Sequence, residues 1–259
     1  MIRYNIVTFG CKANQYDSAV LHNMLVEQGM FQQAKGKLPD LLLVNTCTVT
    51  GSADAQARRK INNLRRRYPE SKIIVFGCLA RGNEKELKKI KAIDHVFAGF
   101  DLCELRDVIN AQFSLPKNNA GKGNPLKVFP GHTRAFLKIQ DGCDSYCSYC
   151  IVPYVRGAPR SMDKDSILRQ INAFYESGYR EIVLTGIHLG IYGGDFDHGE
   201  NLLALLKFLE KRSPVRRIRL SSIEPDELSD DMVDFISGSG LIANHFHLPL
   251  QSADDAVLK

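Results

Sequence analysis

Short apolar runs alternate with helical stretches along most of the sequence, and this alternation constrains the fold more than any other feature. In the first half, strands are predicted at 2–9, 41–44, 73–76 and around 95–97. The segments between them carry apolar residues at helical spacing or end at stop signals such as Gly29 and Pro69. Strands that alternate with helices through short connections form parallel sheets covered on both faces. We therefore predict an α/β fold with a flavodoxin-like open parallel sheet in residues 1–112.

A second alternating series follows a segment without periodicity. Residues 113–132 are rich in Pro, Gly, Asn and Lys, which predicts a linker. Further strands are predicted at 135–139, 181–185, 217–220 and 245–248, with helices between them. Repeated strand and helix units favour a β/α barrel, or part of one, in residues 133–259. The functional residues of such a fold lie at the carboxyl ends of its strands.

Cys143, Cys147 and Cys150 stand on one short loop with the spacing Cys-x3-Cys-x2-Cys. Three thiolates can bind three irons of a cubane cluster and leave the fourth iron open to a substrate. Structural zinc would need a fourth Cys or His, but His132 and His188 are distant in sequence. Disulfides belong mostly to small secreted domains, and three neighbouring cysteines leave one unpaired. The spacing therefore favours an iron-sulfur cluster over zinc or a disulfide.

Cys11, Cys47 and Cys78 each follow a predicted strand and precede a helix. In an open parallel sheet these strand ends share one edge, where ligands bind, so the three residues should converge. Glycines before Cys11 and Cys78 would allow close approach of the backbone to a bulky group. We predict a second three-thiolate cluster here; the alternative is that these are ordinary small buried residues. Cys103 has no such placement and is predicted to be inert.

The chain has a net charge of +5, and most of the basic excess lies in residues 1–112. One predicted helix carries much of it, in Arg58, Arg59, Lys60, Arg65, Arg66 and Arg67. A basic face suits a phosphate backbone. It is also what a solvated helix side looks like, because an apolar stripe would face the core; its members are Ala53, Ala57, Ile61, Leu64 and Tyr68. The charge pattern alone leaves both interpretations open.

The sequence contains no signal peptide and no apolar stretch long enough to cross a bilayer, so no membrane association is expected. Seven cysteines without a secretion signal indicate a reducing compartment, where clustered thiols bind metal or do redox work.

Six motifs, in order, resemble those of the radical S-adenosylmethionine (SAM) methylthiotransferases. They are GCKANQYDS (10–18), VNTCTVT (44–50), GCLA (77–80), the cysteine loop with VPYVRGAPRS (152–161), TGIHLGIYG (185–193) and LPLQS (248–252). The residues around Cys11 and Cys47 are most similar to enzymes that modify N6-threonylcarbamoyladenosine beside the tRNA anticodon. The branch acting on isopentenyladenosine is an alternative. A non-catalytic iron-sulfur carrier or sensor, and a zinc-stabilised tRNA-binding module, are alternatives from other classes.

The resemblance implies two 4Fe-4S clusters, one on Cys143, Cys147 and Cys150 and an auxiliary one on Cys11, Cys47 and Cys78. It further implies that S-adenosyl-L-methionine is cleaved at the first cluster to give a radical that takes hydrogen from C2 of the adenine. The auxiliary cluster would present a methylated sulfur to that carbon. The expected partners are a tRNA substrate and a reducing electron donor of the flavodoxin or ferredoxin type, in the cytoplasm.

Contacts to S-adenosylmethionine are implied for five residues at the second strand series and the cysteine loop: Tyr149, Thr185, Gly186, Ser222 and Glu224. A serine or glutamate at a strand end can equally be a helix cap. Arg156 and Arg160 are expected to face a carboxylate or RNA phosphate, or to lie on the surface.

Family members usually continue through further barrel strands and a small RNA-binding domain. The sequence stops at Lys259. We therefore expect an incomplete radical-SAM β/α barrel, no C-terminal RNA-binding domain, and doubtful turnover by this truncated chain alone.

Overall fold

The computed structural model describes residues 1–34, 37–48, 51–99, 101–115, 124–197 and 199–258. The chain forms two compact units, the first from Met1–Pro130 and Asp144–Gly157 and the second from Gly131–Cys143 and Ala158–Lys259. Residues 144–157 thus belong to the first unit although they follow the predicted linker. Residues 116–123 of that linker, and Val49 and Thr50 of the 44–50 motif, lie outside the described residues. Leu126 and Phe129, from the end of the linker, are buried.

The first unit contains a five-stranded sheet in the order β2-β1-β3-β4-β5, and every pair of neighbours is parallel. Its strands are β1 (Arg3–Thr8), β2 (Phe31–Gln32), β3 (Leu41–Thr46), β4 (Lys72–Gly77) and β5 (His95–Val96). The order 2-1-3-4-5 is that of the flavodoxin-like doubly wound sheet. The predicted fold of this unit is therefore confirmed. The edge strand β2 was not predicted, because two exposed residues carry no periodicity.

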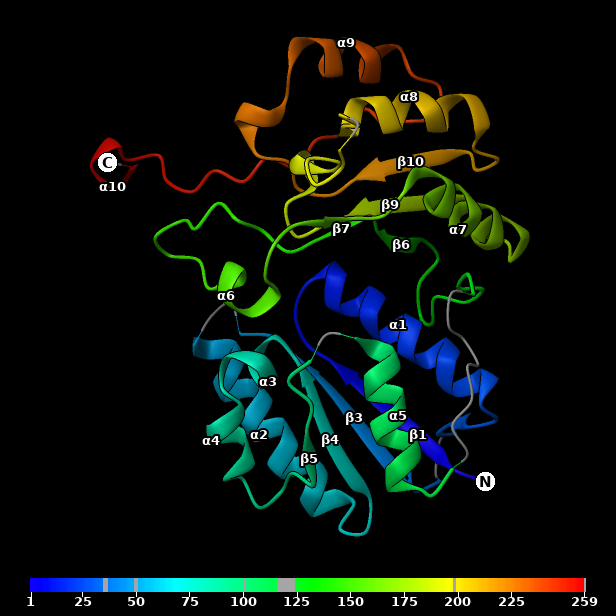
Figure 1. The fold of residues 1–259 in the computed structure, drawn as a ribbon, viewed down its shortest axis with the longest axis vertical. Coiled ribbons are helices and arrows are strands. Elements are labelled where there is room, and N and C mark those ends of the chain that lie inside the picture. The colour runs from blue at the N-terminus through cyan, green and yellow to red at the C-terminus, as the bar shows by residue number, and fades with distance from the viewer. Residues whose placement is uncertain (35–36, 49–50, 100, 116–123, 198, 259) are drawn as a thin grey trace. The chain divides into compact units, whose positions relative to one another are not determined.

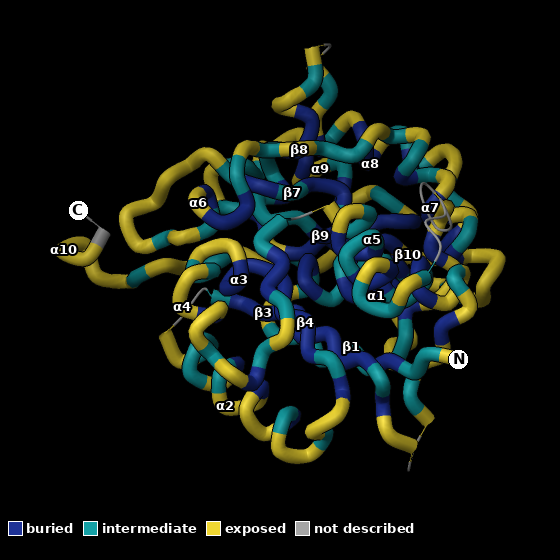
Figure 2. Tube along the Cα trace, turned by 60° about the horizontal axis from the view of Figure 1, so that its bottom comes forward, coloured by how far each residue is buried: buried dark blue, intermediate teal, exposed yellow. Residues whose placement is uncertain are grey.

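Helices cover both faces of this sheet (Figure 1). Side chains of α1 (Lys12–Glu27) and α5 (Leu102–Gln112) share one apolar cluster with Leu41 and Leu43. Those of α2 (Gly51–Arg67), α3 (Cys78–Gly82) and α4 (Glu84–Lys88) share the other with Leu42 and Val44. Successive strand residues point to opposite faces, so β3 is buried throughout (Figure 2).

The sequence after β4 predicts a short helix that carries Leu87 and Ile90. The segment forms two helices instead, because Asn83 leaves the helical conformation (φ −145°) between α3 and α4. Ile90 lies beyond the end of α4. The short helix α6 (Val152–Arg156) was not predicted; it packs against α3, where Gly82 leaves room for Val155.

The apolar stripe of α2 is confirmed at Ala57, Ile61 and Leu64, which are all buried. The basic residues of this helix differ in exposure, and Arg58 is half-buried. Arg65 is used internally: its guanidinium donates to Asp94 and to the carbonyl oxygen of Ser71, at 2.8 Å. Four others are exposed: Arg59, Lys60, Arg66 and Arg67.

The second unit contains a parallel sheet in the order β10-β9-β6. Its elements are β6 (Ala135–Lys138), β7 (Gln140–Asp141), β8 (Arg160–Ser161), α7 (Lys164–Glu176), β9 (Glu181–Thr185), η1 (Leu189–Ile191), α8 (Leu202–Arg212), β10 (Arg217–Leu220), η2 (Pro225–Glu227), α9 (Asp230–Gly238) and α10 (Asp255–Leu258). The strands β7 and β8 form a separate antiparallel pair. A three-stranded parallel sheet with intervening helices does not close, which confirms the predicted incomplete barrel.

The strand predicted at 245–248 is wrong. This segment contributes one isolated bridge, between His247 and Ser222, and a second bridge joins Ile242 to Ile218. His245 and Leu248 are exposed and Phe246 is half-buried. The segment therefore gains too little burial to form an extended ladder, although its alternating pattern is that of a strand. In the part of the chain that the structure describes, no helix is both long and apolar enough to cross a membrane.

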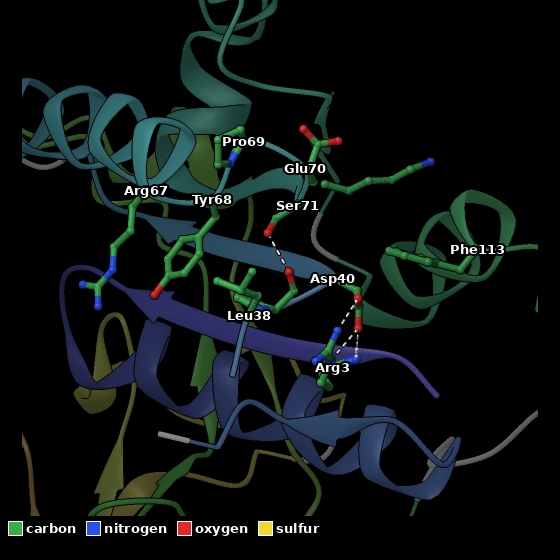
Figure 3. Close-up of a pocket in the computed structure, with 11 residues that line it drawn as sticks. Arg3, Leu38, Asp40, Arg67, Tyr68, Pro69, Glu70, Ser71 and Phe113 are labelled. Carbon is green, nitrogen blue, oxygen red and sulfur yellow. Dashed lines mark hydrogen bonds and ion pairs between the residues drawn. The ribbon is translucent and has the colours of Figure 1, made fainter. Parts of the chain in front are cut away.

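A surface pocket of about 440 Å³ lies at the amino ends of β1, β3 and β4, opposite the edge at which the cysteines follow the strands (Figure 3). Its lining residues are Arg3, Leu38, Pro39, Asp40, Arg67, Tyr68, Pro69, Glu70, Ser71, Lys72 and Phe113. The Asp40 carboxylate accepts from the Arg3 backbone N–H at 2.7 Å and from Arg3 Nε and Nη2 at 3.1 and 3.0 Å. These hydrogen bonds hold the pKa of the Asp40 carboxyl below its usual range. The pair therefore joins the starts of two neighbouring strands.

Asp40→Asn should lower the free energy of unfolding by about 0.5–1 kcal/mol at neutral pH, since the pair is partly exposed. A carboxyl whose pKa is depressed by folding stabilises the protein above its unfolded pKa of about 4, and this contribution is lost as the pH falls through the folded value. The difference between wild type and variant should thus shrink between pH 6 and pH 3. Urea unfolding at a series of pH values measures it, and a difference independent of pH would contradict the assignment.

Candidate metal centre

Cys11, Cys47 and Cys78 follow three neighbouring parallel strands at the carboxyl edge of the first unit's sheet. Cys11 is the residue before α1, Cys47 follows β3 directly, and Cys78 is the first residue of α3. Cys47 and Cys78 are buried, whereas Cys11 is exposed. Burial raises the pKa of the Cys78 thiol, the nearby Arg156 guanidinium lowers it, and the neighbouring thiols of Cys47 and Cys11 also raise it. The structure thus brings together three thiols that are far apart in sequence.

Two glycines allow the close packing around these thiols. Gly10 has φ +93°, and a Cβ there would lie 2.6 Å from Cys47 Cβ and 2.8 Å from its Sγ. Gly77 also has φ +93°, and a Cβ there would lie 2.4 Å from Asn45 Oδ1 and 2.5 Å from the Thr46 carbonyl oxygen. The backbone after β1 therefore passes directly against Cys47.

Buried amide side chains connect the strand ends. Asn14 Nδ2 donates to the carbonyl oxygens of Phe9 and Thr46 at 2.9 and 3.1 Å, and Asn45 Nδ2 donates to the Asn14 carbonyl oxygen at 2.9 Å. Thr46 Oγ1 donates to the carbonyl oxygen of Phe76 at 2.6 Å. Asn14, Asn45 and Thr46 are each at most 1% exposed. These motif residues therefore hold the turns that carry the thiols.

Arg156, on α6, reaches the same edge with a side chain that is 1% exposed. Its Nε lies 3.4 Å from Cys78 Sγ, its Nη1 lies 3.2 Å from Asp17 Oδ2, and its Nη2 donates to Asn14 Oδ1. A surface role is therefore wrong for Arg156, which faces a protein carboxylate. Arg160 is exposed. The contact between Arg156 and Cys78 could not be predicted from sequence, because the two residues are distant along the chain.

The second cysteine triplet lies on a loop without regular secondary structure. Cys143 ends the first segment of the second unit, while Cys147 and Cys150 belong to the first unit. The Cys150 backbone N–H donates to the Cys147 carbonyl oxygen at 2.9 Å. Tyr146, between Cys143 and Cys147, adopts a left-handed conformation (φ 47°). The grouping of the three as one ligand set rests on their spacing in sequence.

No disulfide joins any of the seven cysteines, all of which are described. Among the described residues, no three His, Cys, Asp or Glu side chains are arranged to hold one metal ion. A cubane cluster distributes its thiolates over separate irons.

His188 lies beside Cys143, with 3.4 Å between its Nδ1 and Cys143 Sγ. Its Nε2 is 2.5 Å from Glu227 Oε1, and its backbone N–H donates to Gln140 Oε1 at 2.8 Å. His188 is thus a neighbour of Cys143 in space although the two residues are distant in sequence. Its position was predictable from the fold, because it follows β9, the parallel neighbour of the strand that leads to Cys143.

The five predicted S-adenosylmethionine contacts fall in both units, and their roles stay predictions. Tyr149, on the cysteine loop, is 69% exposed. Thr185 is the buried last residue of β9, followed by Gly186. Ser222 is exposed shortly after β10, and Glu224 directly precedes η2, a position typical of a helix cap. The last four thus lie at carboxyl ends of barrel strands.

Each half of the chain matches a known protein family. Residues 3–99 match the uncharacterized protein family UPF0004, and residues 137–259 match the radical SAM superfamily. The chain is 36% identical to the threonylcarbamoyladenosine tRNA methylthiotransferase MtaB of Bacillus subtilis, over 97% of this chain and 58% of that protein. It is 34% identical to MtaB of Aquifex aeolicus, over 97% of this chain and 63% of that protein. The chain therefore combines a UPF0004 segment with a radical SAM segment, and it is similar over nearly its whole length to tRNA methylthiotransferases.

Another relative bears the name of a different substrate. The tRNA-2-methylthio-N(6)-dimethylallyladenosine synthase of Carboxydothermus hydrogenoformans is 32% identical over 99% of this chain and 61% of its own length. The chain spans about 60% of the length of these relatives.

Solved structures support the fold. One is the radical S-adenosylmethionine methyltransferase TsrM from Kitasatospora setae, with cobalamin and a 4Fe-4S cluster bound. The match covers all of this chain and 62% of the TsrM chain, with a TM-score of 0.63 and 15% sequence identity. Another is the cobalamin-dependent S-adenosylmethionine radical enzyme OxsB. That match covers all of this chain and 45% of the OxsB chain, with a TM-score of 0.63 and 12% sequence identity. At these identities the likeness concerns the fold alone.

Gly10→Ala should destabilise the protein more than Gly29→Ala. Both glycines have positive φ, but a Cβ at Gly29 meets nothing within 4 Å. The control should therefore lose about 1 kcal/mol of unfolding free energy from backbone strain. Gly10→Ala adds overpacking against Cys47 and should lose about 2–4 kcal/mol. Denaturant unfolding of the metal-free chain tests this, and equal losses would show that Gly10 does not pack tightly against Cys47.

Proposed function

We propose that this chain carries the cluster-binding domains of a tRNA methylthiotransferase that adds a methylthio group to C2 of N6-threonylcarbamoyladenosine beside the anticodon. The observation that carries the proposal is the convergence of Cys11, Cys47 and Cys78 at the carboxyl edge of one parallel sheet. The same chain contains the Cys-x3-Cys-x2-Cys loop. Two separate thiol sets match a reaction that needs both a radical source and a sulfur source.

The donor chemistry at the sheet edge fits an auxiliary 4Fe-4S cluster. Thiolates are the usual ligands of such clusters, and Cys47 and Cys78 are buried beside a glycine turn that permits close approach. Cys143, Cys147 and Cys150 would hold the other 4Fe-4S cluster. When bound, the two clusters and S-adenosyl-L-methionine would supply the electron, the radical, the sulfur and the methyl group.

The protein's own residues would position these groups. Asn14, Asn45 and Thr46 fix the turns that present the auxiliary thiols. His188, which is held by Glu227, would orient the side chain of Cys143. Ligand residues are commonly oriented by such neighbouring hydrogen bonds.

We assign the binding of S-adenosylmethionine to the carboxyl ends of β9 and β10 together with the cysteine loop. Thr185 and Gly186, after β9, would meet its amino end, and Tyr149 would border its adenine. Ser222 and Glu224 would meet ribose or methionine groups. Ligands in β/α barrels bind at this face, which supports the assignment.

The proposed macromolecular substrate is tRNA. The relatives named above are tRNA-modifying enzymes. The exposed basic residues of α2 give this chain a phosphate-compatible surface: Arg59, Lys60, Arg66 and Arg67. A flavodoxin- or ferredoxin-type donor in the cytoplasm would supply the electrons. The isopentenyl-type nucleoside is the second candidate, because a relative named for it is nearly as similar.

Anaerobic reconstitution should give about eight irons per chain, from two cubanes of four irons each. Cys143→Ala and Cys47→Ala should each lose about half of this iron, because each removes a ligand of a different cluster. Cys103→Ala, a half-buried cysteine on α5, is the control and should keep all of it. After dithionite reduction, cleavage of S-adenosylmethionine should disappear in Cys143→Ala. Iron near four per chain, unaffected by Cys47→Ala, would remove the auxiliary cluster; zinc in place of iron would contradict both clusters.

The nucleoside is identified by mass analysis of tRNA from cells that lack the gene. Methylthio-threonylcarbamoyladenosine should be lost, and the full-length wild-type gene should restore it whereas a Cys147→Ala gene should not. An unchanged level would contradict the assignment. Selective loss of methylthio-isopentenyladenosine would establish the second candidate.

A further inference from the structure

Arg156 is a buried arginine that contacts one of the auxiliary thiols, Cys78. Its guanidinium is buried and makes contacts in three directions, to Cys78 Sγ, Asp17 Oδ2 and Asn14 Oδ1. Cys78 is 6% exposed, and the Asp17 side chain is 13% exposed. A buried arginine is costly unless its N–H groups are satisfied. These contacts therefore define where the positive charge lies.

The orientation of the guanidinium is fixed by groups that cannot easily move. Asn14 Nδ2 is committed to the carbonyl oxygens of Phe9 and Thr46, so Asn14 Oδ1 must face Arg156. Asp17, one helical turn further along α1, holds Nη1. With both Nη groups held, the rigid planar fork directs Nε toward the sulfur of Cys78, 3.4 Å away. A simple ion pair with Asp17 would not require this third direction.

We propose that Arg156 is a positioning residue that raises the reduction potential of the auxiliary cluster. It would do so by donating an N–H to the Cys78 sulfur and by placing a buried positive charge beside the cluster. The inference rests on the proposed function, because it requires that Cys11, Cys47 and Cys78 hold iron.

The direction of the effect follows from electrostatics. One-electron reduction adds a negative charge to the cluster, and hydrogen bonds to the ligand sulfurs and nearby positive charge favour the reduced state. Burial strengthens both effects because water screens them less. The carboxylate of Asp17 opposes part of the effect. Removal of Arg156 should therefore lower the potential, and removal of the Asp17 charge should raise it.

The test isolates the auxiliary cluster in the full chain by replacing Cys143, Cys147 and Cys150 with alanine. Iron is counted after anaerobic reconstitution, and the midpoint potential is measured by a dithionite titration followed by electron paramagnetic resonance. Arg156→Gln and Asp17→Asn are compared in this background. Arg156→Lys keeps the charge without the planar fork and should give a smaller decrease than Arg156→Gln.

Arg106→Gln is the matched control. Arg106 is also a buried arginine of the first unit, with a side chain 3% exposed and an ion pair to Asp107 at 3.1 Å. The Arg106→Gln substitution should lower the stability of the protein and leave the midpoint potential equal, within error, to that of the triple-alanine chain. The readout therefore separates a specific effect on the cluster from the general consequence of losing a buried arginine.

The expected result is about four irons per chain, a lower potential in Arg156→Gln and a higher one in Asp17→Asn. A loaded cluster whose potential moves in neither variant, or moves equally in Arg106→Gln, overturns the inference and leaves the proposed function intact. No iron in the triple-alanine chain overturns the auxiliary cluster and the inference together. If Arg156→Gln fails to fold, Asp17→Asn decides, since an unchanged or lower potential there contradicts the proposal.

Discussion

The parallel register of β1, β3 and β4 is the constraint on which the first unit's candidate site depends. Thr8 pairs with Asn45, and Thr46 pairs with Gly77, so the three strands end at nearly the same level. Parallel strands place all their carboxyl ends at one edge. A shift of one residue in any pair would turn the alternating side chains to the opposite face and separate the cysteines. The apolar clusters on the two faces prevent such a shift, because β3 and β4 bury both sets of side chains.

The same edge contains several buried polar side chains, whose hydrogen bonds the fold must satisfy. An amide or hydroxyl buried without a partner costs about 1–3 kcal/mol. Here Asn14, Asn45 and Thr46 exchange hydrogen bonds with the backbone of neighbouring turns. The network therefore costs little stability and keeps the turns rigid. Rigid turns are what a cluster bound through three separate segments requires, since each segment can otherwise move independently.

The sequence predicted the features that repeat and missed those that depend on a single contact. Apolar runs located the main strands, and the position of each cysteine after a strand was enough to place three of them at one edge. The edge strand β2 and the helix α6 are too short for periodicity to reveal. The segment 245–248 shows the opposite failure, because its alternation of apolar and polar residues is not matched by burial. His188 and Arg156 were missed as neighbours of cysteines because sequence distance says little about distance in a parallel fold.

Arg156 also shows how the motif after the cysteine loop can serve the other thiol set. It lies six residues after Cys150, yet its charge is buried beside Cys78. Val155, the preceding residue, packs where Gly82 leaves room on α3, the helix that begins with Cys78. The segment that carries Cys147 and Cys150 is therefore anchored in the same unit as the auxiliary thiols. The short helix thus joins the segment that carries Cys147 and Cys150, by chain and by packing, to the sheet edge at which Cys78 lies.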